Sequence, residues 1–200
     1  FEKKLKKRVM SGFNLTCVGD EDAYSYIETP YNNTISDDAI KAALIGKENV
    51  IPYTFLERGS DERQYCSPGI DLPVCTFCRS RFGKYPEYHT SADDFNVVTQ
   101  KGLNDSLEVM KSIIDAFETA LLPINLIKCE PQLGKRNLYP EFSDESINIR
   151  TLNIRKNILV YANSVNTIFE IANLIKVPLI DVINEVKILI KNGIMVSESI

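Results

Sequence analysis

The only histidine of the chain, His89, lies in a polar segment whose residue types suit metal binding or proton transfer. That segment, Tyr85–Asp94, brings carboxylates and hydroxyls close to the imidazole in sequence. A neutral imidazole is the commonest zinc ligand, and a neighbouring carboxylate often fixes which ring nitrogen binds. A lone histidine beside several cysteines is also a generic pattern. On composition alone, a surface or structural histidine is therefore the plainer interpretation.

A second group of chemically useful residue types is the glycine-led turn Gly59-Ser-Asp-Glu-Arg63. It places an acid, a base and a hydroxyl within a few residues of one another. Ser60 or Asp61 is expected to accept backbone N–H groups and so cap the start of a helix. Such a cap would form whatever the protein does, so this turn alone does not separate one function from another.

The five cysteines form no disulfide framework, because their number is odd and their spacing is irregular. This usage suits a reducing compartment, so we expect a cytoplasmic protein. Cys75 and Cys78 have CxxC spacing, but no second such pair exists to complete a tetrahedral zinc site. They lie in Asp71–Cys78, which is typical of a buried strand, whereas a redox CxxC normally opens a helix. We therefore predict two reduced, buried cysteines that pack the core.

An α/β layer in the first part of the chain must position these groups. A β-type run over residues 12–18, a helix over 36–45 capped by Ser36, and a strand over 50–55 give the strand, helix, strand rhythm of such a layer. Pro52 places the last of these strands at an edge or near its own start.

The middle of the chain combines a long polar stretch with one long helix. Residues 57–94 are rich in Gly, Pro, Ser, Asp and Tyr, which is typical of functional loops around a short strand. Apolar residues at helical spacing from Leu103 to Leu121 then predict an amphipathic helix that Pro123 stops.

The last part of the chain predicts a winged helix. Three segments with helical apolar periodicity are followed by a short strand, and the second and third helices would form a helix-turn-helix. These segments are Ile147–Tyr161, Thr167–Ile175, Leu179–Lys191 and Ile194–Val196. We set the domain boundary near residue 145, which gives a first domain over 1–145 and a winged-helix domain over 146–200.

The charge of the predicted recognition helix argues against DNA as its partner. Leu179–Lys191 offers Asp181 and Glu185 against Lys187 and Lys191, without an arginine, so it would repel phosphate about as much as attract it. We therefore expect no sequence-specific DNA binding and favour packing or a protein partner.

The whole chain gives no sign of a charged or membrane partner. A net charge of -4 provides no general attraction to nucleic acid or anionic lipid, and no apolar run is long enough to span a membrane. The lysine-rich opening, Phe1–Arg8, is expected to be a solvated helix face or the lead-in to a strand. Because the sequence does not begin with methionine, we expect a truncated N-terminus.

Three longer segments, Gly59–Val74, Tyr85–Asp93 and Cys129–Arg136, resemble a family of bacterial aminopeptidase-like proteins. That family carries a C-terminal winged helix and is often associated with surface-polysaccharide biosynthesis. The resemblance covers roughly residues 12 to 196 and extends more distantly to two-zinc aminopeptidases and glutamate carboxypeptidases. It implies an α/β fold, namely part of a three-layer αβα zinc-aminopeptidase-like domain plus a small α+β winged-helix domain.

The resemblance also implies roles for individual residues. His89 would be the last zinc ligand, and Tyr88 would be the catalytic residue that lines the pocket where the substrate carbonyl is polarised. Ser60 and Asp61 would shape the wall of that pocket and bind substrate. The substrate would be a peptide or another small molecule with an amide bond, and zinc would be bound in the complete protein.

Several residues that the resembled enzymes need are not found in this sequence. Their early histidine and aspartate, bridging aspartate and Glu-Glu pair all precede its first residue, and Thr16 stands where a metal-binding aspartate is expected, with Asp20 as a substitute. A catalytic zinc takes about three protein ligands, so we expect this chain alone to be inactive and the complete protein to be a zinc metallopeptidase-like hydrolase. The alternatives are a non-hydrolytic binding or scaffold protein in polysaccharide biosynthesis and a winged-helix DNA-binding regulator.

Overall fold

The computed structural model describes residues 6–139 and 145–198 of the chain. They form two compact units, unit 1 (Phe1–Lys111) and unit 2 (Ser112–Ile200), and the division falls within helix α4 (Gln100–Ala120).

Two of the sequence-based expectations touch residues outside the described ranges. Residues 1–5 of the lysine-rich opening and residues 140–144, next to the expected boundary at 145, lie outside them. The assignment of 1–145 to an aminopeptidase-like domain and of 146–200 to the winged helix stays a prediction.

Unit 1 is built on a four-stranded mixed sheet with the strand order β1-β4-β2-β3. Strand β1 runs parallel to β4, β2 runs parallel to β3, and β2 pairs with β4 in the antiparallel sense. The strands are Gly12–Leu15 (β1), Tyr24–Ile27 (β2), Val50–Tyr53 (β3) and Val74–Cys78 (β4). All five residues of β4 are buried, which confirms the buried strand predicted over the end of 71–78. Pro52 lies in the edge strand β3, where its missing N–H costs no ladder hydrogen bond.

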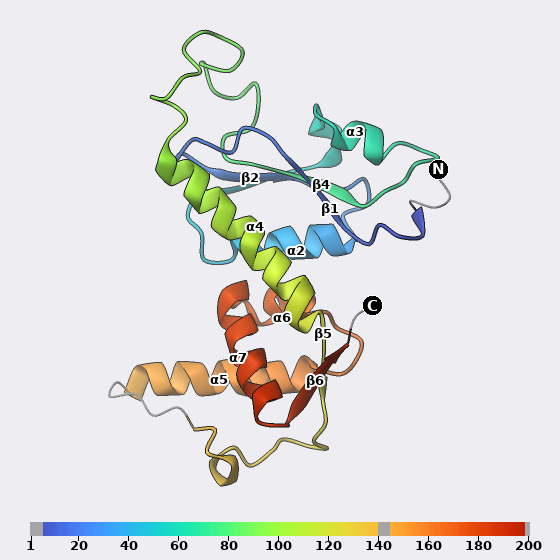
Figure 1. Ribbon diagram of the computed structural model, residues 1–200, viewed down its shortest axis with the longest axis vertical. Coiled ribbons are helices and arrows are strands. Elements are labelled where there is room, and N and C mark those ends of the chain that lie inside the picture. The colour runs from blue at the N-terminus through green and yellow to red at the C-terminus, as the bar shows by residue number, and fades with distance from the viewer. Residues whose placement is uncertain (1–5, 140–144, 199–200) are drawn as a thin grey trace. The chain divides into compact units, whose positions relative to one another are not determined.

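Helices cover both faces of this sheet. Helix α2 (Ile35–Leu44) lies on one face and the short α3 (Glu62–Tyr65) on the other (Figure 1). The alternation of strands and helices confirms the predicted α/β class. Ile27, Ile40 and Phe77 have no exposed surface and belong to the core of unit 1.

Helix α2 begins two residues earlier than predicted, because Thr34 and not Ser36 is its cap. The Thr34 hydroxyl accepts from the Asp37 amide at 3.4 Å, and the Asp37 carboxylate accepts from the Thr34 amide at 3.0 Å, which together form a capping box. Ser36 is buried instead and donates to the Pro73 carbonyl at 2.6 Å. The hydroxyl of Ser36 therefore ties the helix to the start of β4.

The predicted burial of the CxxC cysteines is confirmed, since Cys75 and Cys78 have no exposed surface. Both thiols are free. Burial raises the pKa of the Cys75 thiol, and the nearby Asp37 carboxylate, 3.2 Å away, raises it further. Burial also raises the pKa of Cys78 to about 12. The structure therefore gives both sulfurs a packing role within β4.

We expect a thiol-alkylating reagent to modify Cys129 in the folded chain and to leave Cys75 and Cys78 untouched. Cys129 is exposed, whereas the two buried thiols are shielded and disfavour the reactive thiolate. Mass spectrometry of digested samples, labelled with and without urea, measures this difference. Rapid labelling of either buried cysteine without urea would contradict the prediction, and labelling of all of them in urea is the internal control.

After the end of α4, the described residues of unit 2 form three α-helices and one pair of strands. The helices match the predicted segments within two residues, and the pair is antiparallel. These elements are β5 (Leu122–Asn125), α5 (Glu145–Tyr161), α6 (Ile168–Ile175), α7 (Leu179–Lys191) and β6 (Met195–Glu198). The wing strand predicted near 194–196 is confirmed as β6, but its partner β5 was not predicted. No helix in the described part of the chain is long and apolar enough to cross a membrane.

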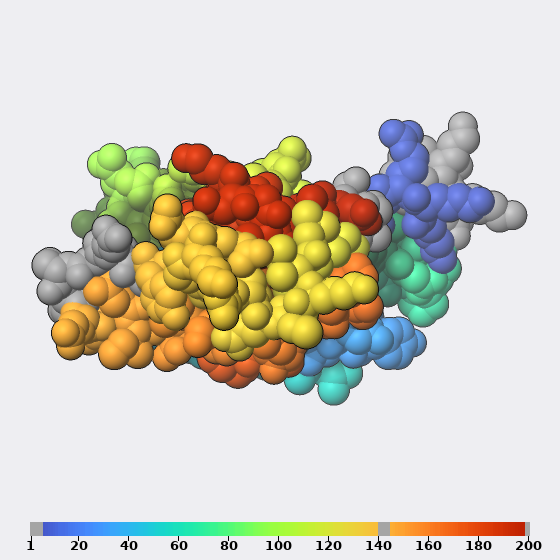
Figure 2. Space-filling model, turned by 90° about the horizontal axis from the view of Figure 1, so that it is seen from below, coloured from blue at the N-terminus to red at the C-terminus, as the bar shows by residue number. Residues whose placement is uncertain are grey.

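Residues 126–139, which follow β5, pack along α5 in unit 2, where they appear in yellow beside the orange helix (Figure 2). The Leu138 carbonyl accepts from the Arg155 guanidinium, and Glu130 Oε1 lies 3.4 Å from Lys156 Nζ. Leu133 is only 2% exposed. The motif Cys129–Arg136 is therefore part of the packing of unit 2.

Candidate functional site

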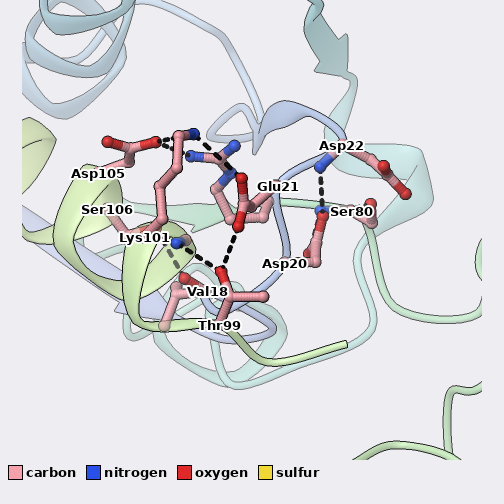
Figure 3. A network of polar contacts seen from close by, with 11 residues as sticks. Val18, Asp20, Glu21, Asp22, Ser80, Thr99, Lys101, Asp105 and Ser106 are labelled. Atoms are coloured by element: carbon pink, nitrogen blue, oxygen red, sulfur yellow. Dashed lines mark hydrogen bonds and ion pairs between the residues drawn. The ribbon is translucent and has the colours of Figure 1, made fainter. Parts of the chain in front are cut away.

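The loops that follow β1 and β4 meet at one edge of the sheet, because parallel strands end on the same side. Asp20 follows β1, and Ser80 follows β4. The Ser80 amide donates to Asp20 Oδ2 at 2.8 Å, and the Ser80 hydroxyl lies 2.7 Å from Asp20 Oδ1 (Figure 3). The Asp22 amide also donates to Asp20 Oδ1, at 3.1 Å. Asp20, considered as a substitute for the missing metal-binding aspartate, thus already accepts three hydrogen bonds and holds the two loops together.

A hollow of about 350 Å³ opens beside Asp20. Its lining is mostly polar and includes four carboxylates. The lining residues are Asp20, Glu21, Asp22, Ser80, Tyr85, Glu87, Asn96, Val97 and Thr99. The pKa of Glu21 is lowered by hydrogen bonds from the Thr99 hydroxyl and from Lys101. The hollow is therefore suited to a polar ligand rather than an apolar one.

The first turns of α4 are fastened to the loop after β1. The Thr99 amide donates to the Gly19 carbonyl at 2.9 Å, and the Ser106 hydroxyl donates to the Val18 carbonyl at 2.7 Å (Figure 3). Gly102 makes this approach possible, since a Cβ at that position would lie 2.0 Å from the Gly19 carbonyl oxygen. The backbone of α4 and the loop 18–20 are thus in direct contact.

An ionic network surrounds this contact. Lys101 Nζ lies 3.2 Å from Glu21 Oε2 and 3.0 Å from Asp105 Oδ2, and the hydrogen bond from Lys101 lowers the pKa of Asp105 (Figure 3). These exposed pairs contribute little stability on their own. Arg79 is different, because its side chain is 2% exposed and its guanidinium lies 3.8 Å from the centre of the Tyr24 ring. Because the guanidinium is buried, this cation–π contact is stronger than an exposed one would be. The contact holds the start of the loop after β4 in place.

The turn that carries Ser60 and Asp61 is organised by Glu62, a residue that sequence reasoning missed. Glu62 has no exposed surface. Its Oε1 accepts from the amides of Gly59 (2.7 Å) and Ser60 (3.1 Å). Its Oε2 accepts from Thr76 Oγ1 (2.7 Å) and Asn14 Nδ2 (3.1 Å). Burial alone would raise the pKa of Glu62, but the hydrogen bonds, led by that from Thr76, lower it below its usual value.

The expectation that Ser60 or Asp61 caps α3 is therefore wrong. Asp61 occupies the N-cap position, but its side chain makes no capping hydrogen bond and is exposed. The buried Glu62 carboxylate takes the neighbouring amides instead. This leaves the Asp61 carboxylate free of any capping role on the surface of the turn.

The loop after β4 lies against the same turn. Arg81 Nη2 donates to the Glu57 carbonyl at 2.5 Å, and its guanidinium lies 5.0 Å from the ring centres of both Tyr53 and Phe82. A Cβ on Gly59 would lie 2.5 Å from the Phe82 ring, so the glycine allows the turn to pack closely on that ring. Arg81 and Phe82 thus join the loop after β4 to the segment 57–62.

Tyr88 and His89 continue from this contact. The Tyr88 ring centre lies 6.4 Å from that of Phe82 and 5.7 Å, edge-on, from that of Tyr85. The imidazole of His89 stacks on Tyr88 at 4.0 Å with an angle of 17° between the planes. His89 is exposed and has a left-handed backbone, with φ of 60°. The four residues singled out by resemblance therefore lie on two segments that pack against each other, the turn at 59–62 and the loop after β4. Their roles stay predictions.

His89 is not part of a group of metal-ligating side chains in the described residues. Among them there is no group of three or more His, Cys, Asp or Glu side chains arranged to bind a metal. His89 is exposed and offers one imidazole, whereas a catalytic zinc takes about three protein ligands.

Comparison with known proteins supports an aminopeptidase-like fold followed by a winged helix. The family model of a domain of unknown function, DUF4910, matches residues 1–120, and a winged helix-turn-helix model matches residues 122–197. A Clostridium acetobutylicum protein, named as a candidate polysaccharide biosynthesis protein with an aminopeptidase-like domain, is 40% identical over 141 residues. That match covers 69% of this chain and 32% of the relative, so the chain matches about a third of the relative's length.

Two solved structures resemble the chain to different extents. A crystal structure of a candidate peptidase from Clostridium acetobutylicum matches 98% of this chain and 43% of its own chain, with a TM-score of 0.79 and 29% identity. An aminopeptidase from Aneurinibacillus sp. strain AM-1 matches 56% of this chain and 28% of its own, with a TM-score of 0.44 and 20% identity. The first of these likenesses gives the chain a peptidase-like fold.

Proposed function

The chain belongs to the DUF4910 family, and from this premise we propose that it supplies one wall of the active site of a zinc-dependent amide-bond hydrolase. The complete protein would act on a peptide or a small amide-bearing substrate in the cytoplasm. The 200 residues alone would be inactive, because the chain matches less than half of the solved peptidase-like relative. The remaining metal ligands and the general base would come from the rest of the protein.

One structural observation carries this proposal, namely the contact between the turn at 59–62 and the loop after β4. The Phe82 ring packs against Gly59, and its centre lies 6.4 Å from that of the Tyr88 ring. Through this contact, the turn that carries Ser60 and Asp61 lies against the loop that carries Tyr88 and His89. Two loops that meet in this way can form the walls of one substrate pocket.

The proposal assigns each of these residues a role. Ser60 and Asp61 contact the substrate from the turn, where the exposed Asp61 carboxylate is available to a cationic substrate group. Tyr88 lines the place where the substrate carbonyl binds. His89 supplies an imidazole to zinc, a metal that in such sites polarises carbonyl groups. Arg81 positions the loop through the Glu57 carbonyl.

A non-hydrolytic binding or scaffold protein in polysaccharide biosynthesis is the second candidate. It is favoured by the exposed position of His89, which stacks on Tyr88 without a metal-binding group around it among the described residues. It is also favoured by the name of the Clostridium acetobutylicum relative. Under this hypothesis the two loops bind a ligand without changing it.

Metal analysis of the complete protein separates the two candidates. We expect His89→Ala in the complete protein to remove about one zinc per chain and most of the hydrolysis of aminoacyl nitroanilides. In the 200-residue chain the same change should leave a weak zinc affinity nearly unchanged, because one imidazole cannot form a closed coordination shell. Elemental analysis of dialysed protein gives the zinc content.

A matched variant in the same exposed loop controls for disturbance of the backbone. Ser91→Ala should leave both zinc content and hydrolysis unchanged, and circular dichroism checks that both variants are folded. Equal zinc content in His89→Ala and the wild-type complete protein would show that His89 is not a ligand. The binding-protein hypothesis would then be the better one.

A further inference from the structure

The acidic side chains of α7 are neutralised within unit 2. Glu185 is 8% exposed, and its Oε2 lies 2.7 Å from Nε of the buried Arg155 on α5. Asp181 Oδ2 lies 3.4 Å from Arg150 Nη2, also on α5. From the sequence alone, both acidic residues were expected on the outer surface of this helix. The structure removes Glu185 from that surface and gives Asp181 a cationic partner.

The side of α7 that remains exposed carries lysines and isoleucines. Its members recur at intervals of three or four residues, so they form one stripe along the helix. This stripe, the α7 face, consists of Ile180, Asn184, Lys187, Ile188 and Lys191, all of them exposed. Neither lysine has an ion-pair partner among the residues that the structure describes. The α7 face is therefore both cationic and apolar.

The exposed isoleucines do not result from a loosely packed helix. The opposite side of α7 is fully buried, with Val182, Ile183 and Leu189 at 0% exposure. Ile180 and Ile188 are nevertheless 47% and 36% exposed. They lie eight residues apart, which corresponds to about 12 Å along a helix. A partner that covers both of them must extend along more than two helical turns.

We propose that the α7 face docks an acidic amphipathic helix of a partner protein. Such a helix offers apolar side chains at the spacing of Ile180 and Ile188, and it offers carboxylates to Lys187 and Lys191. Burial of the apolar residues provides the affinity, and the complementary charges set the orientation and the choice of partner.

The composition of unit 2 favours a protein over DNA as the occupant. Residues 112–200 contain nine Lys or Arg and ten Asp or Glu, so the unit as a whole does not attract a polyanion. Asn184 and the two lysines of the α7 face are of types that read base edges, but the face carries no arginine. Two half-exposed isoleucines beside it are better covered by apolar side chains than by the polar floor of a DNA groove.

Binding of designed peptides to the full 200-residue chain tests this proposal. The probe is a fluorescein-labelled helical peptide of repeated Leu-Glu-Glu-Leu-Leu-Glu-Glu units, and its counterpart has lysine in place of every glutamate. We expect the acidic peptide to bind at least about tenfold more tightly than the basic one, as measured by fluorescence anisotropy. A labelled DNA duplex of random sequence, at the same salt concentration, should bind more weakly than the acidic peptide.

Variants of the chain locate the binding surface. The double change Lys187→Glu with Lys191→Glu should weaken acidic-peptide binding by about tenfold or more, and Ile180→Ser with Ile188→Ser should weaken it similarly. Lys135→Glu, an exposed lysine elsewhere in unit 2, should leave it unchanged. Failure of the wild-type chain to prefer the acidic peptide would overturn the proposal. Tighter binding of the duplex, lost with the lysine variants but not with the isoleucine variants, would assign the face to DNA.

Discussion

Replacing Gly102 by alanine is expected to destabilise unit 1 by about 3 kcal/mol, although alanine is the better helix former. The added Cβ would lie 2.0 Å from the Gly19 carbonyl oxygen and 2.6 Å from that of Asp20. Both obstacles are backbone atoms, which cannot rotate away as a side chain can. Gly19 cannot shift easily either, because its own Cα packs against Val98. The helix and the loop would have to separate.

Separation of α4 from this loop would also break the polar contacts between them. The Thr99 amide bonds to the Gly19 carbonyl, and the Ser106 hydroxyl bonds to the Val18 carbonyl. Each lost hydrogen bond of this kind costs about 1 kcal/mol. These losses add to the steric cost, which explains why the expected effect exceeds that of a typical surface substitution.

Urea unfolding followed by circular dichroism measures the effect of Gly102→Ala. Asn104→Ala is the matched control, since Asn104 is exposed on the same helix and the change also introduces a better helix former. The control should be neutral or slightly stabilising. A gain of about 1 kcal/mol for Gly102→Ala, the usual result for glycine in a helix interior, would show that the close approach of helix and loop does not exist.

The helices of unit 2 were predictable because their signals are local. Apolar periodicity gave α5, α6 and α7 within two residues, and the capping box of Thr167 and Glu170 marks the start of α6. Strand β5 had no such signal. It is four residues long, contains Pro123, and pairs with β6 more than 70 residues later in the chain. A short strand defined by a distant partner cannot be recognised from its own residues.

The charge pattern of α7 was misread for the same reason. The sequence shows Glu185 on a helix, but it does not show that Arg155, from another helix, draws its carboxylate into the interior. Helical periodicity places Glu185 between Val182 and Leu189 on the inner side of α7. That position was the signal in the sequence that Glu185 is buried. A charged residue at an apolar position of a helix indicates a buried partner elsewhere in the chain.

The candidate site depended on resemblance rather than on pattern. Ser60 and His89 are far apart in sequence, and the segments that carry them are connected by the packing of Gly59 on Phe82. Composition gave no sign of that contact. Glu62 was visible as part of the turn, but its function as the acceptor for Asn14 and Thr76 depends on two strands that the sequence did not place beside it.

Replacing Glu62 by glutamine is expected to destabilise unit 1 by about 3 kcal/mol at neutral pH. The carboxylate accepts four hydrogen bonds and has no exposed surface, so water cannot take over any of them. The amide oxygen of glutamine can still accept from Gly59 and Ser60. Its NH₂ group would then face Asn14 Nδ2, which is also a donor, and Asn14 would keep only Thr76 Oγ1, 3.1 Å away, as an acceptor.

The effect of Glu62→Gln should depend on pH in a defined direction. The pKa of Glu62 is lowered in the folded protein, so its charged form stabilises the fold above the unfolded pKa of about 4.3. That contribution is lost as the pH falls through the folded pKa. In acid the wild-type carboxyl becomes protonated and resembles the neutral amide. The free-energy difference between wild type and variant should therefore shrink as the pH is lowered.

Urea titrations of both proteins at a series of pH values measure this difference, with Glu108→Gln as the control. Glu108 is exposed on α4, so the same chemical change there should cost little at any pH. The pKa of Asp37 is also lowered, because hydrogen bonds from Thr29 and Thr34 outweigh the effect of its burial. Protonation of Asp37 in acid therefore lowers the stability of wild type and variant alike. The difference between the two proteins thus isolates Glu62. If the free-energy difference between wild type and variant stays constant into acid, the charge of the carboxylate does not hold the turn that carries Ser60. The shape of the side chain would then hold it instead.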